Sequence, residues 1–279
     1  MPSRNTSAYL PSRNINKLDD LIMAIKPIIK QQLLSCFLGW ITLLLSIPAL
    51  ASQSIDQIKN EFIHAATRGQ VARVKSLLTE SHPFDQSTLD QAIIEATRNG
   101  QDKIVEILLD SGADIEASVE DNRSLLHLAT RDDRIEVARL LLAKGIRKDA
   151  TTTDGTTALM IAAEYHRIEI LRLLIQAGAD IEVSDQEGVT ALMHAARTNF
   201  QIGVQDLLRA GANVNKITNS GATALMLAAQ NGHQNILKTL LFAGADPNIE
   251  ASNGATALLL AQKYKHHDTV KMLLSAVTR

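Results

Sequence analysis

Small and large apolar residues recur at fixed places along residues 52–279. Pairs of small residues, such as Ala162-Ala163, Ala195-Ala196 and Ala228-Ala229, are each followed by a polar stretch and then by a leucine-containing run. The leucines of these runs return every 33 residues, at Leu108, Leu141, Leu174, Leu207, Leu240 and Leu273. The pattern predicts repeated pairs of short helices, with small side chains where the helices and the neighbouring units approach closely.

Glycines mark the ends of the predicted helices. The segment Gly155-Thr156-Thr157-Ala158-Leu159-Met160 returns in similar form from residues 188, 221 and 254. Its glycine permits a tight hairpin tip, and its second threonine can cap the helix that follows. A second row of glycines is predicted to end the second helix of each unit in a left-handed cap. This row consists of Gly112, Gly145, Gly178, Gly211 and Gly244.

Two short helices cannot bury their apolar faces alone, so the units are predicted to stack side by side. The expected fold is all-α: a solenoid in which each unit of 33 residues contributes a helix-turn-helix and a β-hairpin or loop. We predict about seven units over residues 52–279. The first is degenerate, because Gly69 and Gly100 are 31 residues apart, and the last is predicted to be a C-terminal cap.

These residues resemble the ankyrin-repeat family. Gly112-Ala113-Asp114, Gly178-Ala179-Asp180 and Gly244-Ala245-Asp246 match the loop motif of the family, and Asn231-Gly232-His233 matches its turn between helices. The family's Thr-Pro-Leu-His motif is altered, with alanine for proline and mostly methionine for histidine; only His127 keeps the histidine. The resemblance spans residues 56–279. It implies a module that binds proteins and does not catalyse a reaction.

Composition and motifs support a binding role without a cofactor. The formal net charge of −2 does not favour nucleic acid as a partner, and 3% aromatic residues suit a core of alanine and leucine. The one cysteine, Cys36, excludes an intramolecular disulfide. No phosphate-binding loop or His-Glu-x-x-His motif is present, and adjacent histidines on a helix, such as His266-His267, point to different sides. We therefore expect no enzyme, cofactor or metal.

Residues 1–51 have the three parts of a secretory signal peptide. Lys26 and Lys30 precede an apolar run over residues 33–45, and Ala49-Leu50-Ala51 has the small-x-small form of a cleavage site. Met23 is an alternative start of the chain. The signal predicts a periplasmic or secreted protein of a bacterium. Two alternatives remain: an uncleaved membrane anchor over residues 33–50, and an acylation site at Cys36, which has little apolar sequence before it.

The candidate binding residues occupy two recurrent positions. The position after the small pair, where the family presents variable side chains to a groove, holds Arg98, Arg131, Glu164, Arg197, Gln230 and Lys263. Beside it lie Tyr165, Asn231 and Tyr264. The hairpin tips hold Asp121, Asp154, Glu187, Ser220 and Asn253. The sequence thus suggests a basic ladder with an acidic rim over its first half, against the alternative that these charges only solvate the surface.

The most direct functional interpretation is a monomeric module that binds another protein through this groove and the hairpin tips. It includes the specific hypothesis of an inhibitor or immunity-type partner of an exported enzyme. The alternative is a structural or protective component of the cell envelope that stabilises another exported factor. Contact with a membrane is expected only through an uncleaved leader.

Overall fold

The computed structural model describes residues 55–79 and 84–277. The chain divides into two compact parts, residues 1–58 and residues 59–279. The description below concerns the second part, and "unit" continues to mean one repeat. The predicted leader and Cys36 lie outside the described residues.

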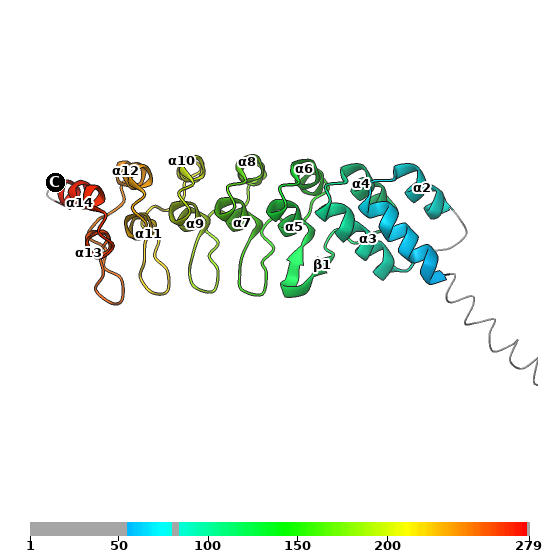
Figure 1. Ribbon diagram of the computed structural model, residues 1–279, viewed down its shortest axis with the longest axis horizontal. Helices are drawn as coiled ribbons and strands as arrows, with labels where there is room; N and C mark the ends of the chain where they lie inside the picture. The colour runs from blue at the N-terminus through cyan, green and yellow to red at the C-terminus, as the bar shows by residue number, and fades with distance from the viewer. Residues whose placement is uncertain (1–54, 80–83, 278–279) are drawn as a thin grey trace, which may run out of the picture. The chain divides into compact units, whose positions relative to one another are not determined.

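The described chain forms successive pairs of antiparallel helices (Figure 1). A helix that ends at residue 67 precedes α2 (Val71–Thr79). The following pairs are α3 (Gln86–Arg98) with α4 (Asp102–Asp110), α5 (Leu125–Arg131) with α6 (Ile135–Ala143), α7 (Ala158–Glu164) with α8 (Ile168–Gln176), α9 (Ala191–Arg197) with α10 (Gln201–Arg209), α11 (Ala224–Gln230) with α12 (Gln234–Phe242), and α13 (Ala257–Lys263) with α14 (His267–Val277).

The helix pairs stack in two layers. From α3 onward, each first helix contacts the first helix of the next unit, and the second helices, α2 included, do the same from α2 to α14. We call these layers the first-helix row and the second-helix row. The hairpins extend from the side of the first-helix row (Figure 1). This arrangement confirms the predicted all-α repeat fold.

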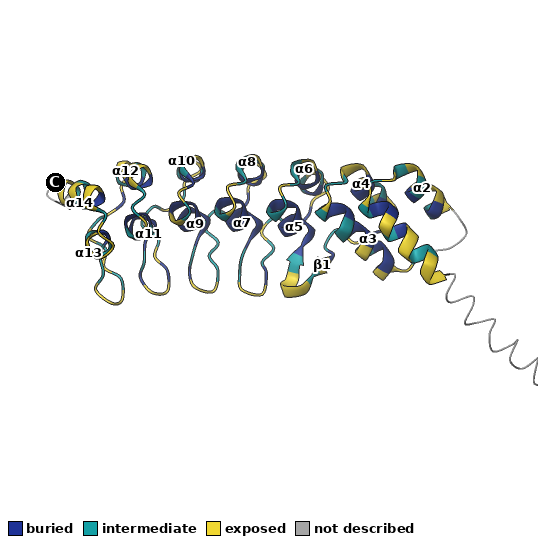
Figure 2. Ribbon diagram, viewed as in Figure 1, coloured by how far each residue is buried: buried dark blue, intermediate teal, exposed yellow. Residues whose placement is uncertain are grey.

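The core lies where the two rows and the neighbouring units meet (Figure 2). All the recurrent leucines of the second helices are fully buried, from Leu108 to Leu273. Ala162 and Ala163 are also fully buried, as small residues must be where backbones approach closely. Met160 is 1% exposed and its equivalents Met193 and Met226 are equally buried, so the methionines belong to the core between units.

The threonines cap the first helices as predicted. The hydroxyl of Thr157 accepts a hydrogen bond from the N–H of Met160, and Thr190, Thr223 and Thr256 accept from the equivalent residues. In the unit of α5, Ser124 and His127 form a reciprocal capping box. Each cap satisfies backbone donors that the first turn of a helix leaves free.

Neighbouring hairpins are joined by main-chain hydrogen bonds. The first complete hairpin pairs β1 (Ser118–Val119) with β2 (Arg123–Ser124) across a 3-10 turn. Its tip carbonyl, that of Asp121, accepts a hydrogen bond of 2.9 Å from the N–H of Thr153 in the next hairpin. The same 2.9 Å bond joins Asp154 to Gln186, Glu187 to Asn219, and Ser220 to Ser252. These bonds fix the register of one unit against the next.

A second set of contacts ties each unit to the one before it. Arg134 donates through Nε to the carbonyl of Arg98 at 2.7 Å, and Arg167 donates to that of Arg131 at 2.9 Å. His266 occupies the equivalent position and bonds the carbonyl of Gln230 through Nε2 at 2.9 Å, which gives this histidine a structural role.

The unit of α10 replaces this hydrogen bond by aromatic packing. Phe200 occupies the equivalent position and has no side-chain donor, and its ring stacks on that of His166 with 4.7 Å between centroids. His166 in turn reaches forward, with its Nε2 3.0 Å from the carbonyl of Thr198.

Two glycines, one in a hairpin and one at the end of a second helix, provide a test of the register between hairpins. Gly188 has φ +82° and an added Cβ would lie 2.8 Å from the backbone nitrogen of Asn219 in the next hairpin. Gly178 has a similar φ of +74°, but its Cβ would meet nothing within 4 Å. Both substitutions to alanine should lose about 1–2 kcal/mol through the left-handed backbone. Gly188→Ala should lose a further 1–3 kcal/mol, roughly, because the next hairpin must move.

Urea unfolding of the two variants measures this difference. Gly178→Ala is the matched control, since it lies in the same part of the array and carries the same backbone strain. Equal unfolding midpoints for the two variants would show that contact between hairpins does not set the register.

Candidate binding surface

The predicted ladder residues lie along the first-helix row, one at the C-terminal end of each helix. Each is the last residue of its helix: Arg98 of α3, Arg131 of α5, Glu164 of α7, Arg197 of α9, Gln230 of α11 and Lys263 of α13. The residues that follow three of them, Tyr165, Asn231 and Tyr264, are the C-caps. Because first helices contact one another in order, these residues form a row that faces the hairpins. We call the surface between this row and the hairpin tips the groove.

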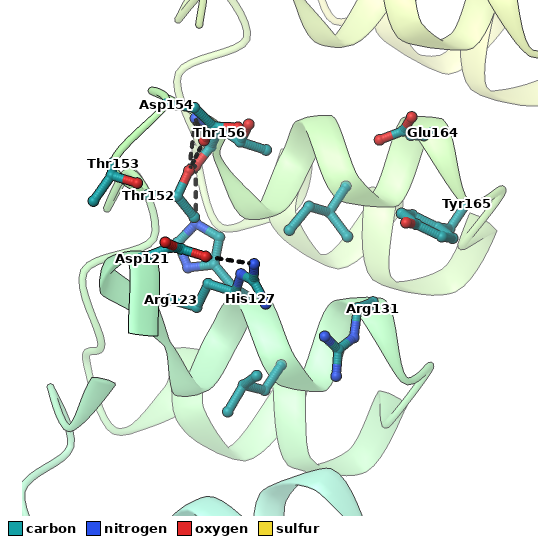
Figure 3. Close-up of a pocket in the computed structure, with 12 residues that line it drawn as sticks. Asp121, Arg123, His127, Arg131, Thr152, Thr153, Asp154, Thr156, Glu164 and Tyr165 are labelled. Carbon is teal, nitrogen blue, oxygen red and sulfur yellow. Dashed lines mark hydrogen bonds and ion pairs between the residues drawn. The ribbon is translucent and has the colours of Figure 1, made fainter. Parts of the chain in front are cut away.

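A hollow of about 580 Å³ lies in the groove at α5 and α7 (Figure 3). Asp121 and Asp154 line it from the hairpins, and Arg131, Glu164 and Tyr165 line it from the helix ends. Leu128 and Ile161 contribute apolar surface between the two sides, as does the edge of the buried His127. Five of the residues predicted from the sequence therefore share one hollow.

A second hollow of about 390 Å³ lies further along the groove, where α9 and α11 meet their hairpins. Glu187, Arg197 and Ser220 line it, with Val189 and Leu227 as its apolar part.

Six predicted residues line neither hollow: Arg98, Gln230, Asn231, Asn253, Lys263 and Tyr264. Two of them have local structural roles. Asn231 donates to the carbonyl of Leu227 at 2.9 Å, and Asn253 accepts from the N–H of Ala255 at 3.0 Å. Near the C-terminus the ammonium of Lys263 lies 5.6 Å from the ring centroid of Tyr264, where both side chains are exposed.

The arginines of the ladder are paired with carboxylates. Arg98 contacts Glu95 at 3.0 Å within its own helix. Arg131 contacts the adjacent Asp132 at 3.0 Å, and this hydrogen bond raises the pKa of the guanidinium. These pairs are partly exposed, so each contributes little to stability, but each removes free positive charge from the groove.

The third arginine is paired across two units. Arg197 contacts Glu164, the ladder residue of the preceding unit, at 3.1 Å. The ladder therefore does not present the continuous basic strip suggested by the sequence.

The groove instead carries surplus negative charge at its hairpins. Asp154 makes no ion pair within the described residues, and the hydrogen bond from Thr152 lowers its pKa, which keeps it ionised. Glu187 at the next tip is exposed and likewise forms no ion pair with a described residue. Asp121 differs, because Arg123 neutralises it at 2.7 Å.

Sequence reasoning missed His194, which belongs to α9 in the groove. Its equivalents Leu128 and Leu227 line the two hollows, so the histidine replaces an aliphatic side chain of the groove wall. It is 7% exposed. Arg197 Nη2 lies 3.0 Å from Nδ1, so the guanidinium donates and the ring hydrogen resides on Nε2.

The Nε2 atom of His194 is buried without a hydrogen bond. The nearest carboxylate oxygen, on Asp185, is 3.9 Å away, beyond hydrogen-bond distance. Burial lowers the pKa of His194 below its ordinary value of 6.5, so the ring is neutral at neutral pH. A buried donor without a partner is costly, so the fold pays for a histidine at this position where other units have an aliphatic residue.

Other kinds of site find no support in the part of the chain that the structure describes. Within residues 55–79 and 84–277, no group of three or more histidine, cysteine, aspartate or glutamate side chains is arranged to hold a metal ion. No helix in these same ranges has the length and apolar character needed to cross a membrane.

The buried histidine predicts how stability depends on pH. As the pH falls below about 6.5, the unfolded chain binds a proton at His194 that the folded chain refuses, so the free energy of unfolding decreases. His194→Leu, which installs the residue of the equivalent positions 128 and 227, should remove part of this decrease. The buried His127, whose pKa burial also lowers, should supply the remainder. Urea unfolding at about pH 7.5 and about pH 5.5 measures this decrease. If the free energy of unfolding decreased as much in the variant as in the parent, the prediction would be wrong.

Comparison with known proteins identifies the fold family. The profile described as "Ankyrin repeats (3 copies)" matches residues 116–185, 177–251 and 204–278, which together are more than half of the chain. The crystal structure of the ankyrin repeat domain of Bcl-3, a unique member of the IkappaB protein family, is similar with a TM-score of 0.66 and 28% sequence identity. The match covers 75% of this chain and 97% of that one.

Because 555 chains of solved structures match, the fold alone does not name a partner. A search of curated proteins gave no match. Ankyrin repeats are protein-protein interaction modules and are typically non-catalytic. On the matched repeats, the buried leucine row and the capped first helices, the chain belongs to the ankyrin-repeat family.

Proposed function

We propose that this chain is an exported module that binds a protein through the part of the groove between α5 and α11. The observation that carries the proposal is the pair of hollows at this place, one of about 580 Å³ and one of about 390 Å³. Both combine apolar walls with charged rims. This combination suits an extended segment or loop whose apolar side chains enter the two hollows and whose charged side chains meet their rims.

The charges of the groove favour a partner segment with basic side chains. Asp154 and Glu187 have no cation partner among the described residues, whereas Arg131 and Arg197 are already paired. An acidic segment would have to displace Asp132 or Glu164 before it could reach these arginines. A basic segment reaches the hairpin tips without that cost. The basic residues of the ladder would by themselves favour an acidic partner, but their ion pairs lead us to propose a basic one.

The location that we propose is the cell envelope, on the strength of the leader in the sequence. In that compartment the chain would act as an inhibitor or immunity-type partner of an exported enzyme. A protective component that stabilises another exported factor is the second candidate. Capture from envelope extracts distinguishes them, since the first candidate recovers an enzyme whose activity the chain lowers.

Charge reversal at the hairpin tips tests the groove. The double variant Asp154→Lys/Glu187→Lys should bind the captured partner with an association rate about tenfold lower at low salt, and the difference should shrink as salt is added. The variant should keep its helical circular dichroism, because both side chains are exposed at the tips.

The matched control is Glu106→Lys/Glu250→Lys, which makes the same change of charge at exposed residues away from both hollows. Equal slowing by the two double variants would show only an effect of net charge. Unchanged association of the groove variant would refute the groove as the binding surface.

The proposed export has its own test. Cleavage after Ala51 should give a mature protein whose first residue is Ser52, as N-terminal sequencing of the protein from the envelope fraction would show. An intact leader on membrane-bound protein would support the anchor alternative instead.

A further inference from the structure

A large aromatic side chain of the second-helix row is exposed to solvent. Phe242 is the last residue of α12 and is 95% exposed. Burial of a phenylalanine side chain is favourable, and folding of the described chain leaves this apolar surface in contact with water.

The repeat shows that this phenylalanine is a departure from the ordinary residue at its position. The equivalent residues of the other units are polar or small: Asp110, Ala143, Gln176, Arg209 and Ser275. All of them are exposed. The position therefore faces solvent in every one of these units, and nothing in the packing of the repeat requires an aromatic side chain there.

Phe242 lies between two hollows of the same face. One, of about 660 Å³, extends over α10 and α12 and is lined by Leu208, Thr239 and Ala243 besides Phe242. The other, of about 440 Å³, extends toward α14 and includes Leu241, Pro247, Met272 and Ala276. Phe242 thus separates two partly apolar hollows. We call Phe242, together with the residues that line these two hollows, the Phe242 patch.

The charges of the Phe242 patch are all positive. Lys238 borders both hollows and forms no ion pair with a described residue, and Arg209 borders the larger one. Neither hollow is lined by an aspartate or a glutamate, although acidic residues outnumber basic ones in the chain, 30 to 28. The nearest compensation is Asp206, which pairs with Arg209 at 2.9 Å but also with Arg172 at 2.8 Å.

We propose that the Phe242 patch is a second protein-binding surface, and that its partner is a segment whose apolar side chains are flanked by carboxylates. Apolar side chains of such a segment enter the two hollows on either side of Phe242. Its carboxylates reach Lys238 and Arg209 at the rim. The charge of the patch decides against a symmetric second copy of this chain, which would bring Lys238 against its own equivalent.

The shape of the patch decides between a protein and a membrane surface. A flat anionic membrane would accept the phenylalanine and the lysine, but it would leave the two hollows unfilled. A segment with protruding side chains fills them. The inference concerns a surface apart from the groove and does not depend on the function proposed above.

Selection from a library of displayed random peptides tests the chemistry of the partner directly. The full-length chain serves as the target, and Phe242→Gln, which installs the residue of the equivalent position 176, serves for counter-selection. Enriched peptides should combine aromatic or aliphatic side chains with aspartate or glutamate. Their affinity should fall at least about tenfold in Phe242→Gln, because an apolar contact of this size is lost.

Control variants separate this surface from others. Lys238→Glu should weaken the same peptides, whereas Arg139→Glu, the charge reversal at the equivalent position of α6, should not. Ile217→Gln removes another exposed apolar side chain, 52% exposed, and should have no effect. Asp154→Lys/Glu187→Lys should also leave this binding unchanged, so that failure of the groove proposal and failure of this one give different results.

Three results would overturn the proposal. The first is the enrichment of basic peptides, or of none that depend on Phe242. The second is a Phe242-dependent dimer in sedimentation, which would identify a second copy as the occupant. The third is Phe242-dependent flotation with anionic vesicles without selection of acidic peptides, which would identify a membrane surface.

Discussion

The structure depends on the register between neighbouring hairpins. A main-chain hydrogen bond of 2.9 Å joins each hairpin tip to the next hairpin from Asp121 to Ser252, and it holds successive backbones so close that Gly188 has no room for a Cβ. With that spacing fixed, only small residues such as Ala162 and Ala163 fit between the first helices. The leucines of the second helices then bury one another across units. Each unit is therefore stable only beside its neighbours, as in other one-dimensional arrays.

Because the register is constant, departures from the repeat are informative. A position that faces the same surroundings in every unit has an ordinary residue, and an unusual residue there needs a local reason. Phe200 has one, since its ring stacks on His166 where other units use a hydrogen bond. His194 and Phe242 have no such compensation within the fold: one holds a buried donor without a partner and the other exposes an aromatic ring. For the exposed ring of Phe242, a binding partner is the compensation that we propose.

The fold could be predicted from the sequence because the same residue types recur every 33 residues. Glycine, threonine and leucine at constant spacing specified hairpin, cap and core, and Thr157 and Leu174 have the roles that the period assigned to them. The electrostatics of the groove were not accessible in this way. Arg197 and Glu164 are a full unit apart in the chain, and only the packed structure shows that their side chains meet. Phe242 departs from its polar or small equivalents in the sequence, but only the structure shows that its side chain is exposed.

A net charge of −2 conceals two surfaces of opposite character. The groove has carboxylates at Asp154 and Glu187 that pair with no cation in the described part of the chain, whereas the charged residues that line the hollows of the Phe242 patch are Lys238 and Arg209. The groove belongs to the hairpins and the first-helix row, and the patch belongs to the second-helix row (Figure 1). A segment bound at one therefore does not cover the other. Their opposite charges also favour different partners, because a basic segment that suits the hairpin tips is repelled by Lys238. One repeat architecture thus carries two surfaces of opposite charge, which differ in their exposed side chains and share the same buried core.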